Sequence, residues 1–243
     1  MKRADVITIF PGFFDAVQFG VMGQAIKDGQ YGFKAHDLRD WTTDRHRSTD
    51  DTPFGGGPGM VMLAAPLIRA VEAIDPAHEA CRILMSPRGE PFGQRMAGEL
   101  AQLDRLLVVC GRYEGVDERV RPYLDREISL GDFVLSGGEP AALALVDAVV
   151  RLIPGVLGNS QSAGDESFSS GVLEYPQYTR PREICGHKVP EVILSGDHAA
   201  INRWRRGMAL LITKRRRPDL FGRLTLSVKE MELIEELEEQ EQK

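Results

Sequence analysis

Apolar residues in the first two-thirds of the chain fall into short continuous runs that alternate with amphipathic stretches. The apolar runs at residues 6–10, 82–86 and 106–110 predict buried strands. Helical spacing predicts helices from about residue 13 to 27 and from 139 to 153. This alternation is typical of an α/β domain with a mostly parallel sheet flanked by helices.

Shorter elements complete this first region. A helix is expected to begin near Pro91, because proline suits the first turn of a helix. A short helical stretch is expected at residues 117–124 and a strand around residues 127–130. Residues 159–171 are rich in Ser, Gly and acidic side chains with little to bury, which predicts a linker.

The pattern changes after this linker. We expect a short strand at residues 192–194 and a helix over 197–217, with Asp197 as its N-cap and Pro218 at its end. A final helix is expected over 227–240, with Met231, Ile234 and Leu237 as its apolar stripe. The chain is therefore divided into a domain at 1–158, a linker at 159–171 and a small α-helical domain at 172–243.

Charge changes the picture of the second domain. The formal net charge is −6, which by itself disfavours nucleic acid as a partner. Basic residues nevertheless dominate residues 178–217, and the acidic residues 230–241 hide this excess in the total. Because a polyanion responds to local charge density, a basic surface on an acidic protein is predicted.

The sequence disfavours two classes of protein, those that span a membrane and those held together by disulfide bonds. No stretch approaches the roughly 18 apolar residues of a membrane span. The apolar run at 6–10 is too short for a signal peptide, so a cytoplasmic protein is expected. Cys81, Cys110 and Cys185 are scattered, which argues against a disulfide framework or a zinc site, and Cys110 is interpreted as a small buried apolar residue.

Four glycine-bearing segments are candidates for chemistry: residues 54–60, 111–115, 130–135 and 136–139. Glycine lets a backbone approach a ligand closely, and the last three segments follow or interrupt predicted strands, where α/β folds bind ligands. Tight turns are the alternative interpretation. The chain has neither a P-loop nor a Rossmann glycine motif, and these loops carry Glu114 and Asp132 but no lysine, which favours a neutral or cationic ligand.

At these loops the sequence closely resembles the bacterial tRNA (guanine-N1)-methyltransferases of the SPOUT class. The similarity follows the family's order and spacing over nearly the whole chain and excludes only the acidic tail. It is carried by residues 9–11, 50–60, 84–87, 110–119, 131–139, 153–158, 178–181 and 194–198.

The resemblance implies a trefoil-knotted sheet, a fold that general rules of chain connection would not predict. It also implies a homodimer with active sites shared between subunits and S-adenosylmethionine as the methyl donor. The donor contacts that it implies are Leu84, Met85, Ser86, Pro87, Gly111, Tyr113, Glu114, Gly115, Leu130, Gly131, Asp132, Phe133, Val134, Leu135, Ser136, Gly137 and Gly138.

The implied reaction is methylation of N1 of the guanosine immediately 3′ of the tRNA anticodon, position 37. Guanine N1 holds its proton at neutral pH, so a carboxylate is needed to remove it, and an arginine would stabilise charge on O6. Alignment to the family identifies this arginine as Arg151. The family usually has aspartate before a Ser-Phe or Ser-His pair, whereas here Glu166 precedes Ser167. The position immediately before the Ser-Phe pair favours Glu166 as the base, and Asp165, one residue earlier, is the alternative.

The tRNA anticodon stem-loop is the expected partner. The protein is expected to recognise bases that are splayed out of the loop and to contact the phosphates. Tyr178 and Trp204 are candidates for base stacking, although core packing is favoured for Trp204. The resemblance also implies a use of Mg²⁺, but no acidic cluster identifies a site. Candidates for phosphate contact are Arg180, Lys188, Arg203, Arg205, Lys214 and Arg215, with Arg216 and Arg217.

Two other functions stay open. One is an RNA-binding protein that keeps the knot without turnover, to which the glutamate at position 166 gives some weight. The other is an α/β nucleotide-binding enzyme that acts on a small metabolite. The absent nucleotide motifs and the arginine-rich second domain count against it.

Overall fold

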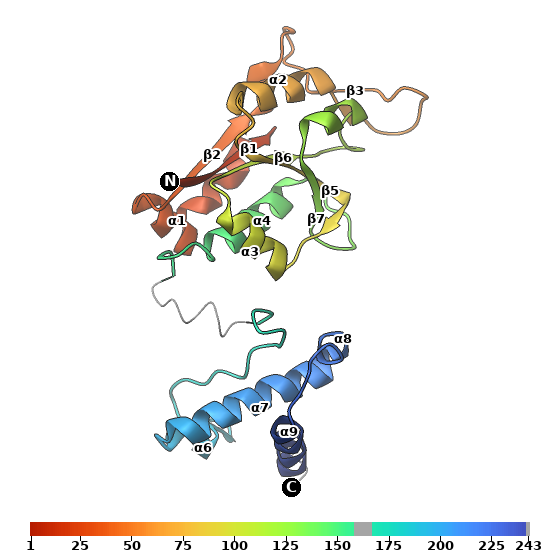
Figure 1. Ribbon diagram of the computed structural model, residues 1–243. Helices are drawn as coiled ribbons and strands as arrows, with labels where there is room; N and C mark the ends of the chain where they lie inside the picture. Colours follow the sequence, from red (N-terminus) through yellow and green to blue (C-terminus); the bar gives the residue numbers. More distant parts are fainter. Residues whose placement is uncertain (158–166, 242–243) are drawn as a thin grey trace. The chain divides into compact units, whose positions relative to one another are not determined.

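The computed structural model describes residues 1–157 and 167–241. Contacts within the chain divide it into two compact units, residues 1–160 and 161–243 (Figure 1). Each unit has a hydrophobic core of its own, so each is described by itself.

The first unit is built on a five-stranded sheet in the order β2-β1-β6-β5-β7, and every strand pairing in it is parallel. The carboxyl ends of its strands therefore lie at one edge. This confirms the expected α/β class. The strands are β1 (Lys2–Thr8), β2 (Tyr31–Asp37), β5 (Cys81–Pro91), β6 (Arg105–Cys110) and β7 (Arg126–Ser129).

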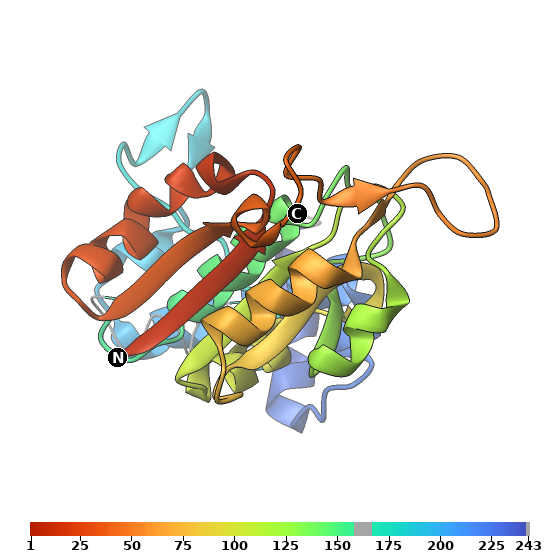
Figure 2. The ribbon, with the colours of Figure 1, turned by 90° about the horizontal axis from the view of Figure 1, so that it is seen from above.

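Both faces of the sheet are covered, which explains why its central strands read as continuous apolar runs. Helices α1 (Gly20–Lys27), α3 (Gln94–Gln102) and α4 (Glu139–Val150) contribute to the core on one face. Helix α2 (Ala64–Ile74) covers the other face, as Figures 1 and 2 show. The short helices η2 (Leu38–Trp41) and η3 (Glu118–Tyr123) pack beside α2.

Two predicted helices of this unit differ from the observed ones. The helix expected over 13–27 is two elements, the 3-10 helix η1 (Pro11–Gln18) and α1, because Phe19 is extended and Gly20 has φ +62°. The helix expected to begin near Pro91 begins at Gln94, because β5 continues through Pro91. Strand β2, helix α2 and the small hairpin of β3 (Asp50–Asp51) and β4 (Val61–Met62) were not predicted.

The second unit is mainly helical, as expected. It contains α6 (Glu191–Leu194), α7 (His198–Arg216), α8 (Pro218–Phe221) and α9 (Val228–Glu241), and a small hairpin of β8 (Glu183–Ile184) and β9 (His187–Lys188). Asp197 caps α7, where its carboxylate accepts hydrogen bonds from the backbone N–H groups of Ala199 and Ala200 at 2.9 and 3.0 Å. This confirms the predicted N-cap. In the described part of the chain, no helix is long and apolar enough to cross a membrane.

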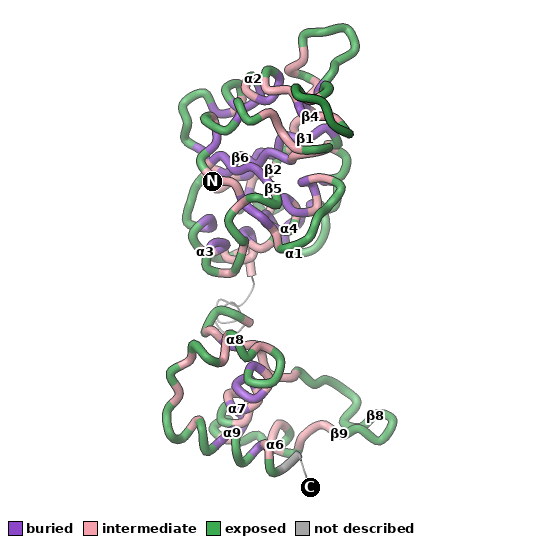
Figure 3. Tube along the Cα trace, turned by 90° about the vertical axis from the view of Figure 1, so that its right-hand side faces the viewer, coloured by how far each residue is buried: buried purple, intermediate pink, exposed green. Residues whose placement is uncertain are grey.

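Two predictions for this unit are wrong. Residues 192–194 form the helical turn α6 and not a strand, because Pro190 opens the turn and its carbonyl accepts a hydrogen bond from the Ile193 N–H at 3.0 Å. The buried stripe of α9 includes Leu233 in place of the exposed Met231. Leu233 and Leu237 pack over Gly207 of α7, where a side chain would collide with them. Figure 3 shows this buried seam.

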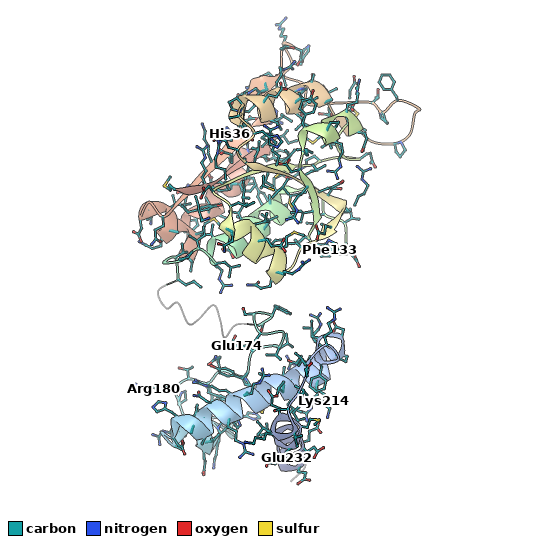
Figure 4. The ribbon with its side chains drawn as sticks, viewed as in Figure 1. His36, Phe133, Glu174, Arg180, Lys214 and Glu232 are labelled. Carbon is teal, nitrogen blue, oxygen red and sulfur yellow. The ribbon has the colours of Figure 1, made fainter. Side chains whose placement is uncertain are left out.

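Buried charges stabilise the sheet of the first unit. The Asp5 carboxylate lies 2.8 Å from Nε2 of His36 (Figure 4) and accepts a hydrogen bond from Arg3. The Asp75 carboxylate accepts a hydrogen bond from Nε of Arg82 at 2.9 Å. Burial alone would raise the pKa of both aspartates, but these hydrogen bonds outweigh burial and lower it.

A lowered pKa makes the stability of this unit dependent on pH. The stabilisation is complete above the ordinary aspartate pKa of about 3.9, and it is lost as the pH falls from there through the lowered pKa. We expect Asp75→Asn to lower the free energy of unfolding at pH 7 by about 3 kcal/mol, because it leaves Arg82 buried without its charge partner. We also expect a smaller loss of stability on acidification than in the wild type.

The measurement is urea unfolding between pH 2 and 7, with the fluorescence of Trp41 as the signal that reports unfolding. A Trp204→Phe background confines the signal to the first unit, because the chain has two tryptophans. Equal acid sensitivity of the wild type and Asp75→Asn would contradict this role of Asp75.

Candidate active site

A cavity of about 420 Å³ lies at the carboxyl ends of β5, β6 and β7. Residues 84–88 of β5 line it, residues 111–116 follow β6, and the third segment runs from Ile128 at the end of β7 to Gly138, without Asp132. The parallel sheet thus brings together three segments that are far apart in sequence. Phe133, in the loop after β7, marks this part of the unit in Figure 4.

The predicted donor-binding residues gather around this cavity. All of them line it except Asp132. Seven further residues line it: Arg112, which lies within the implied contact range 111–115, and Arg88, Val116, Glu118, Ile128, Ser129 and Ala141, which were not predicted. Of these, Arg112, Val116 and Glu118 lie within the family-like segment 110–119, so that segment already held the signal. Donor binding by these residues stays a prediction.

The loop after β6 has a strained backbone that is tied to a neighbouring segment. Tyr113 has φ +57° and Gly115 has φ +122°. The N–H of Glu114 donates to the carbonyl of Met60 at 3.0 Å, and the N–H of Met62 donates to the carbonyl of Gly115 at 2.9 Å. The glycine segment at residues 54–60 therefore supports the cavity loop from outside and does not line the cavity.

The loop after β7 meets the loop after β6 through backbone atoms. The N–H of Gly138 donates to the carbonyl of Gly111 at 2.8 Å. A Cβ atom at Gly138 would lie 2.9 Å from both the Cα of Cys110 and the N of Gly111, which is closer than such atoms approach. Glycine is therefore required at position 138, where two backbones touch.

Charges around the cavity are mostly paired. Arg88 donates to the Glu118 carboxylate at 3.1 Å, and Nε of Arg112 donates to the buried Glu139 carboxylate at 2.8 Å. Burial, and then the nearby Asp50 carboxylate, raise the pKa of Tyr113. Burial, and then the Glu139 carboxylate, raise the pKa of the Cys110 thiol, so it stays protonated; this agrees with its interpretation as a buried apolar residue.

The candidate catalytic residues are placed only in part. Arg151 is the C-cap of α4, and its backbone N–H donates to the carbonyl of Asp147 at 3.2 Å. Glu166 and Asp165 lie outside the described residues. No group of three or more His, Cys, Asp or Glu among the described residues could hold a metal ion, so the use of Mg²⁺ stays a prediction.

Two of the predicted phosphate-binding cations are paired with α9: Arg203 donates to Glu236 at 2.8 Å, and Lys214 donates to Glu238 at 2.9 Å. Arg206, which was not among those candidates, donates to Glu230 at 2.9 Å. Hydrogen bonds from Ser227, and then from Arg206, lower the pKa of Glu230 to about 2. The basic and acidic segments, separate in sequence, thus face each other in space; Figure 4 labels Lys214 on α7 and Glu232 on α9.

The other candidates have different surroundings. The Arg205 guanidinium lies 5.0 Å from the centroid of the Tyr175 ring, and Lys188 lies 3.9 Å from the Glu183 carboxylate. Arg180 is exposed in the segment before α7 (Figure 4). Trp204 packs at the edge of the second unit's core, as favoured above, and its ring lies 6.2 Å from that of the half-exposed Tyr178.

Comparison with known proteins gives a consistent result. The family model described as tRNA (Guanine-1)-methyltransferase TrmD matches residues 1–223. The tRNA (guanine-N(1)-)-methyltransferase of Syntrophotalea carbinolica is 53% identical over 239 residues, covering 97% of this chain and 96% of the relative. The enzyme of the same name from Moorella thermoacetica is 52% identical, covering 98% of each chain.

The contact at Gly138 can be tested by adding a single methyl group. We expect Gly138→Ala to weaken binding of S-adenosylhomocysteine, the expected product, about tenfold, equivalent to about 1.4 kcal/mol, because the two loops must move apart. Gly98→Ala is the matched control, since a Cβ there meets nothing within 4 Å. Titration calorimetry measures both affinities, and equal affinities would show that the loop contact does not shape the cavity.

Proposed function

The chain belongs to the tRNA (guanine-1)-methyltransferase TrmD family, and on that premise we propose that it transfers a methyl group from S-adenosylmethionine to N1 of guanosine 37 in tRNA. The observation that carries this proposal is the single cavity around which the family-implied donor contacts gather. The cavity lies at the carboxyl ends of parallel strands, and this is the edge at which α/β sheets bind ligands.

The lining of the cavity fits the proposed donor. A volume of about 420 Å³ lies within the usual range for small-molecule sites. Its walls offer many backbone N–H and carbonyl groups from the glycine loops, which suit the polar edges of an adenosyl group. Its charged lining residues are Glu114 and three members of ion pairs: Arg88 is paired with Glu118, and Arg112 with Glu139, so no unpaired cation among them favours a phosphate.

The proposed chemistry needs a base and a group that stabilises negative charge. The donor supplies a methyl group on a cationic sulfur and leaves as S-adenosylhomocysteine. Glu166, or Asp165 in the alternative, takes the N1 proton as the new N–C bond forms. Arg151 stabilises the charge that develops on O6.

A homodimer with shared active sites, and the trefoil knot, are part of this proposal. An apolar hollow on the first unit supports association with a second copy. It is lined by Phe13, Phe19, Met22, Pro140 and Leu143, and Phe19 is 76% exposed. Exposed aromatic side chains in one hollow are typical of an interaction surface.

Binding of the anticodon stem-loop is assigned to the cations of the second unit. Exposed ion pairs contribute little, so phosphates can displace the carboxylates from Arg203 and Lys214. Affinity for tRNA should fall steeply with added salt, because each phosphate contact releases counterions. A tRNA-modifying enzyme acts where tRNA is found, which is consistent with the expected cytoplasmic location.

The function is tested by single-turnover methylation of two tRNA transcripts that differ only at position 37. We expect the guanosine transcript to accept one methyl group and the adenosine transcript to accept none, because only guanine offers this N1–H. Binding of tRNA without methyl transfer would favour the non-catalytic RNA-binding alternative. No observation favours the small-metabolite alternative.

Two variants identify the base in the same assay. Glu166→Ala should lower the rate of methyl transfer at least a hundredfold, the range over which general bases act, while binding of S-adenosylhomocysteine is retained. Near-normal transfer by Glu166→Ala, with loss of transfer in Asp165→Ala, would reassign the role to Asp165.

The pairing of α7 with α9 gives a prediction for tRNA affinity. Glu236→Gln with Glu238→Gln releases Arg203 and Lys214, and we expect tRNA to bind about 2–5-fold more tightly, in proportion to the strength of exposed ion pairs. The matched control is Glu232→Gln with Glu235→Gln, which changes the net charge equally at two α9 carboxylates that pair with no described cation. Equal tightening in both double variants, measured by filter binding at several salt concentrations, would mean that net charge alone matters.

A further inference from the structure

One carboxylate beside the cavity has no access to solvent. Glu139 is the first residue of α4, and its exposed fraction is 0%. Its Oε1 accepts a hydrogen bond from the hydroxyl of Thr8 at 2.8 Å, and its Oε2 accepts one from Nε of Arg112 at 2.8 Å. Thr8 ends β1 and is itself fully buried. A single side chain therefore joins β1, the loop after β6 and the start of α4.

Arg112 extends this connection into the wall of the cavity. Its terminal nitrogen donates to the carbonyl of Ser136 at 3.2 Å, and its guanidinium lies 4.6 Å from the centroid of the Phe10 ring. Its backbone forms an isolated antiparallel bridge with Gly137. The Arg112 side chain thus spans the junction of the two glycine loops, and both Arg112 and Ser136 line the cavity.

The fit between Arg112 and Gly137 leaves no room for a side chain. A Cβ atom at Gly137 would lie 2.2 Å from Nε of Arg112. The guanidinium is planar and holds its donors in a fixed fork, so one group can bond to Glu139 and to the Ser136 carbonyl at a set separation. A lysine ammonium on a flexible stem lacks this fixed geometry.

We propose that Arg112 and Glu139 are positioning residues that set the width of the donor cavity by holding the loop at residues 111–115 against the loop at residues 130–138. This inference rests on the proposed function, because it assigns the held loops to the methyl donor. The pair does not react: its effect is on the donor's affinity, through the backbone groups on either side of the junction. A buried ion pair is by itself weak evidence for stability. An experiment must therefore distinguish an effect on the width of the cavity from an effect on the stability of the fold.

A second ion pair with a buried carboxylate, in the same unit, offers a control. Asp75 and Arg82 are also buried, with 2.9 Å between Oδ2 and Nε, and neither lines the cavity. Arg112→Met and Arg82→Met each remove the cation that is hydrogen-bonded to a buried carboxylate, although Asp75 keeps a second guanidinium, that of Arg105, at 3.6 Å. If the role of Arg112 were only structural, the two variants would change donor affinity in proportion to their loss of stability.

The experiment measures the Kd for S-adenosylhomocysteine, the separate KM values for S-adenosylmethionine and tRNA, and the thermal midpoint of the full-length variants. We expect Arg112→Met to raise the Kd and the donor KM at least tenfold and the tRNA KM less than twofold. Arg82→Met should lower the thermal midpoint by a similar amount and change the Kd less than twofold. Arg112→Lys, which keeps the charge, should be intermediate in Kd and replaces Arg112→Met if that variant does not fold.

A double variant sharpens the distinction. Arg112→Met with Glu139→Leu removes the unpaired buried charge and should recover most of the thermal midpoint, but the Kd should stay raised because the contact with Ser136 is still missing. Recovery of the Kd together with the midpoint, or an equal rise in Kd for Arg82→Met, would overturn the positioning role. Failure of the wild-type protein to bind S-adenosylmethionine or S-adenosylhomocysteine would instead refute the proposed function.

Discussion

The buried carboxylate of Glu139 is the constraint on which the geometry of the candidate active site depends. An ionised group without access to water is costly unless it is paired and hydrogen-bonded. Thr8 and Arg112 meet that requirement from two other segments, so the end of β1, the loop after β6 and the start of α4 must assemble together. The cavity wall is a direct consequence, because Arg112 then reaches the carbonyl of Ser136.

The parallel sheet explains where this constraint acts. Strands β5, β6 and β7 run in the same direction, so residues 84–88 of β5 and the loops that follow β6 and β7 meet at one edge, although the sequence separates them by tens of residues. Close approach of these loops requires glycine at particular points. Gly138 touches the backbone at Cys110, and Gly137 lies under Arg112, whereas Gly98 has no such neighbour. Glycine content alone therefore does not identify the site, but glycine after consecutive parallel strands does.

The second unit shows that the order of charges along a chain does not give their arrangement in space. Helix α9 packs Leu233 and Leu237 over Gly207, and this places its glutamates beside α7. Arg203, Arg206 and Lys214 consequently have carboxylate partners. The family match ends at residue 223, before α9 begins, so this electrostatic counterpart lies outside the part shared with the family model. A polyanion that binds Arg203, Arg206 or Lys214 must therefore compete with a helix of the same chain.

The sequence by itself determined the α/β class, the central strands, the N-cap at Asp197 and most of the residues that line the cavity. These features rest on local pattern or on motifs whose residues are contiguous. Tertiary structure alone decided the contacts of Glu139 with Thr8 and Arg112 and the pairing of α7 with α9, because each joins residues distant in sequence. It also decided that residues 192–194 form a helical turn and that Leu233, not Met231, is buried. Short apolar segments have no preference strong enough to resist their surroundings, so neighbouring contacts select their conformation.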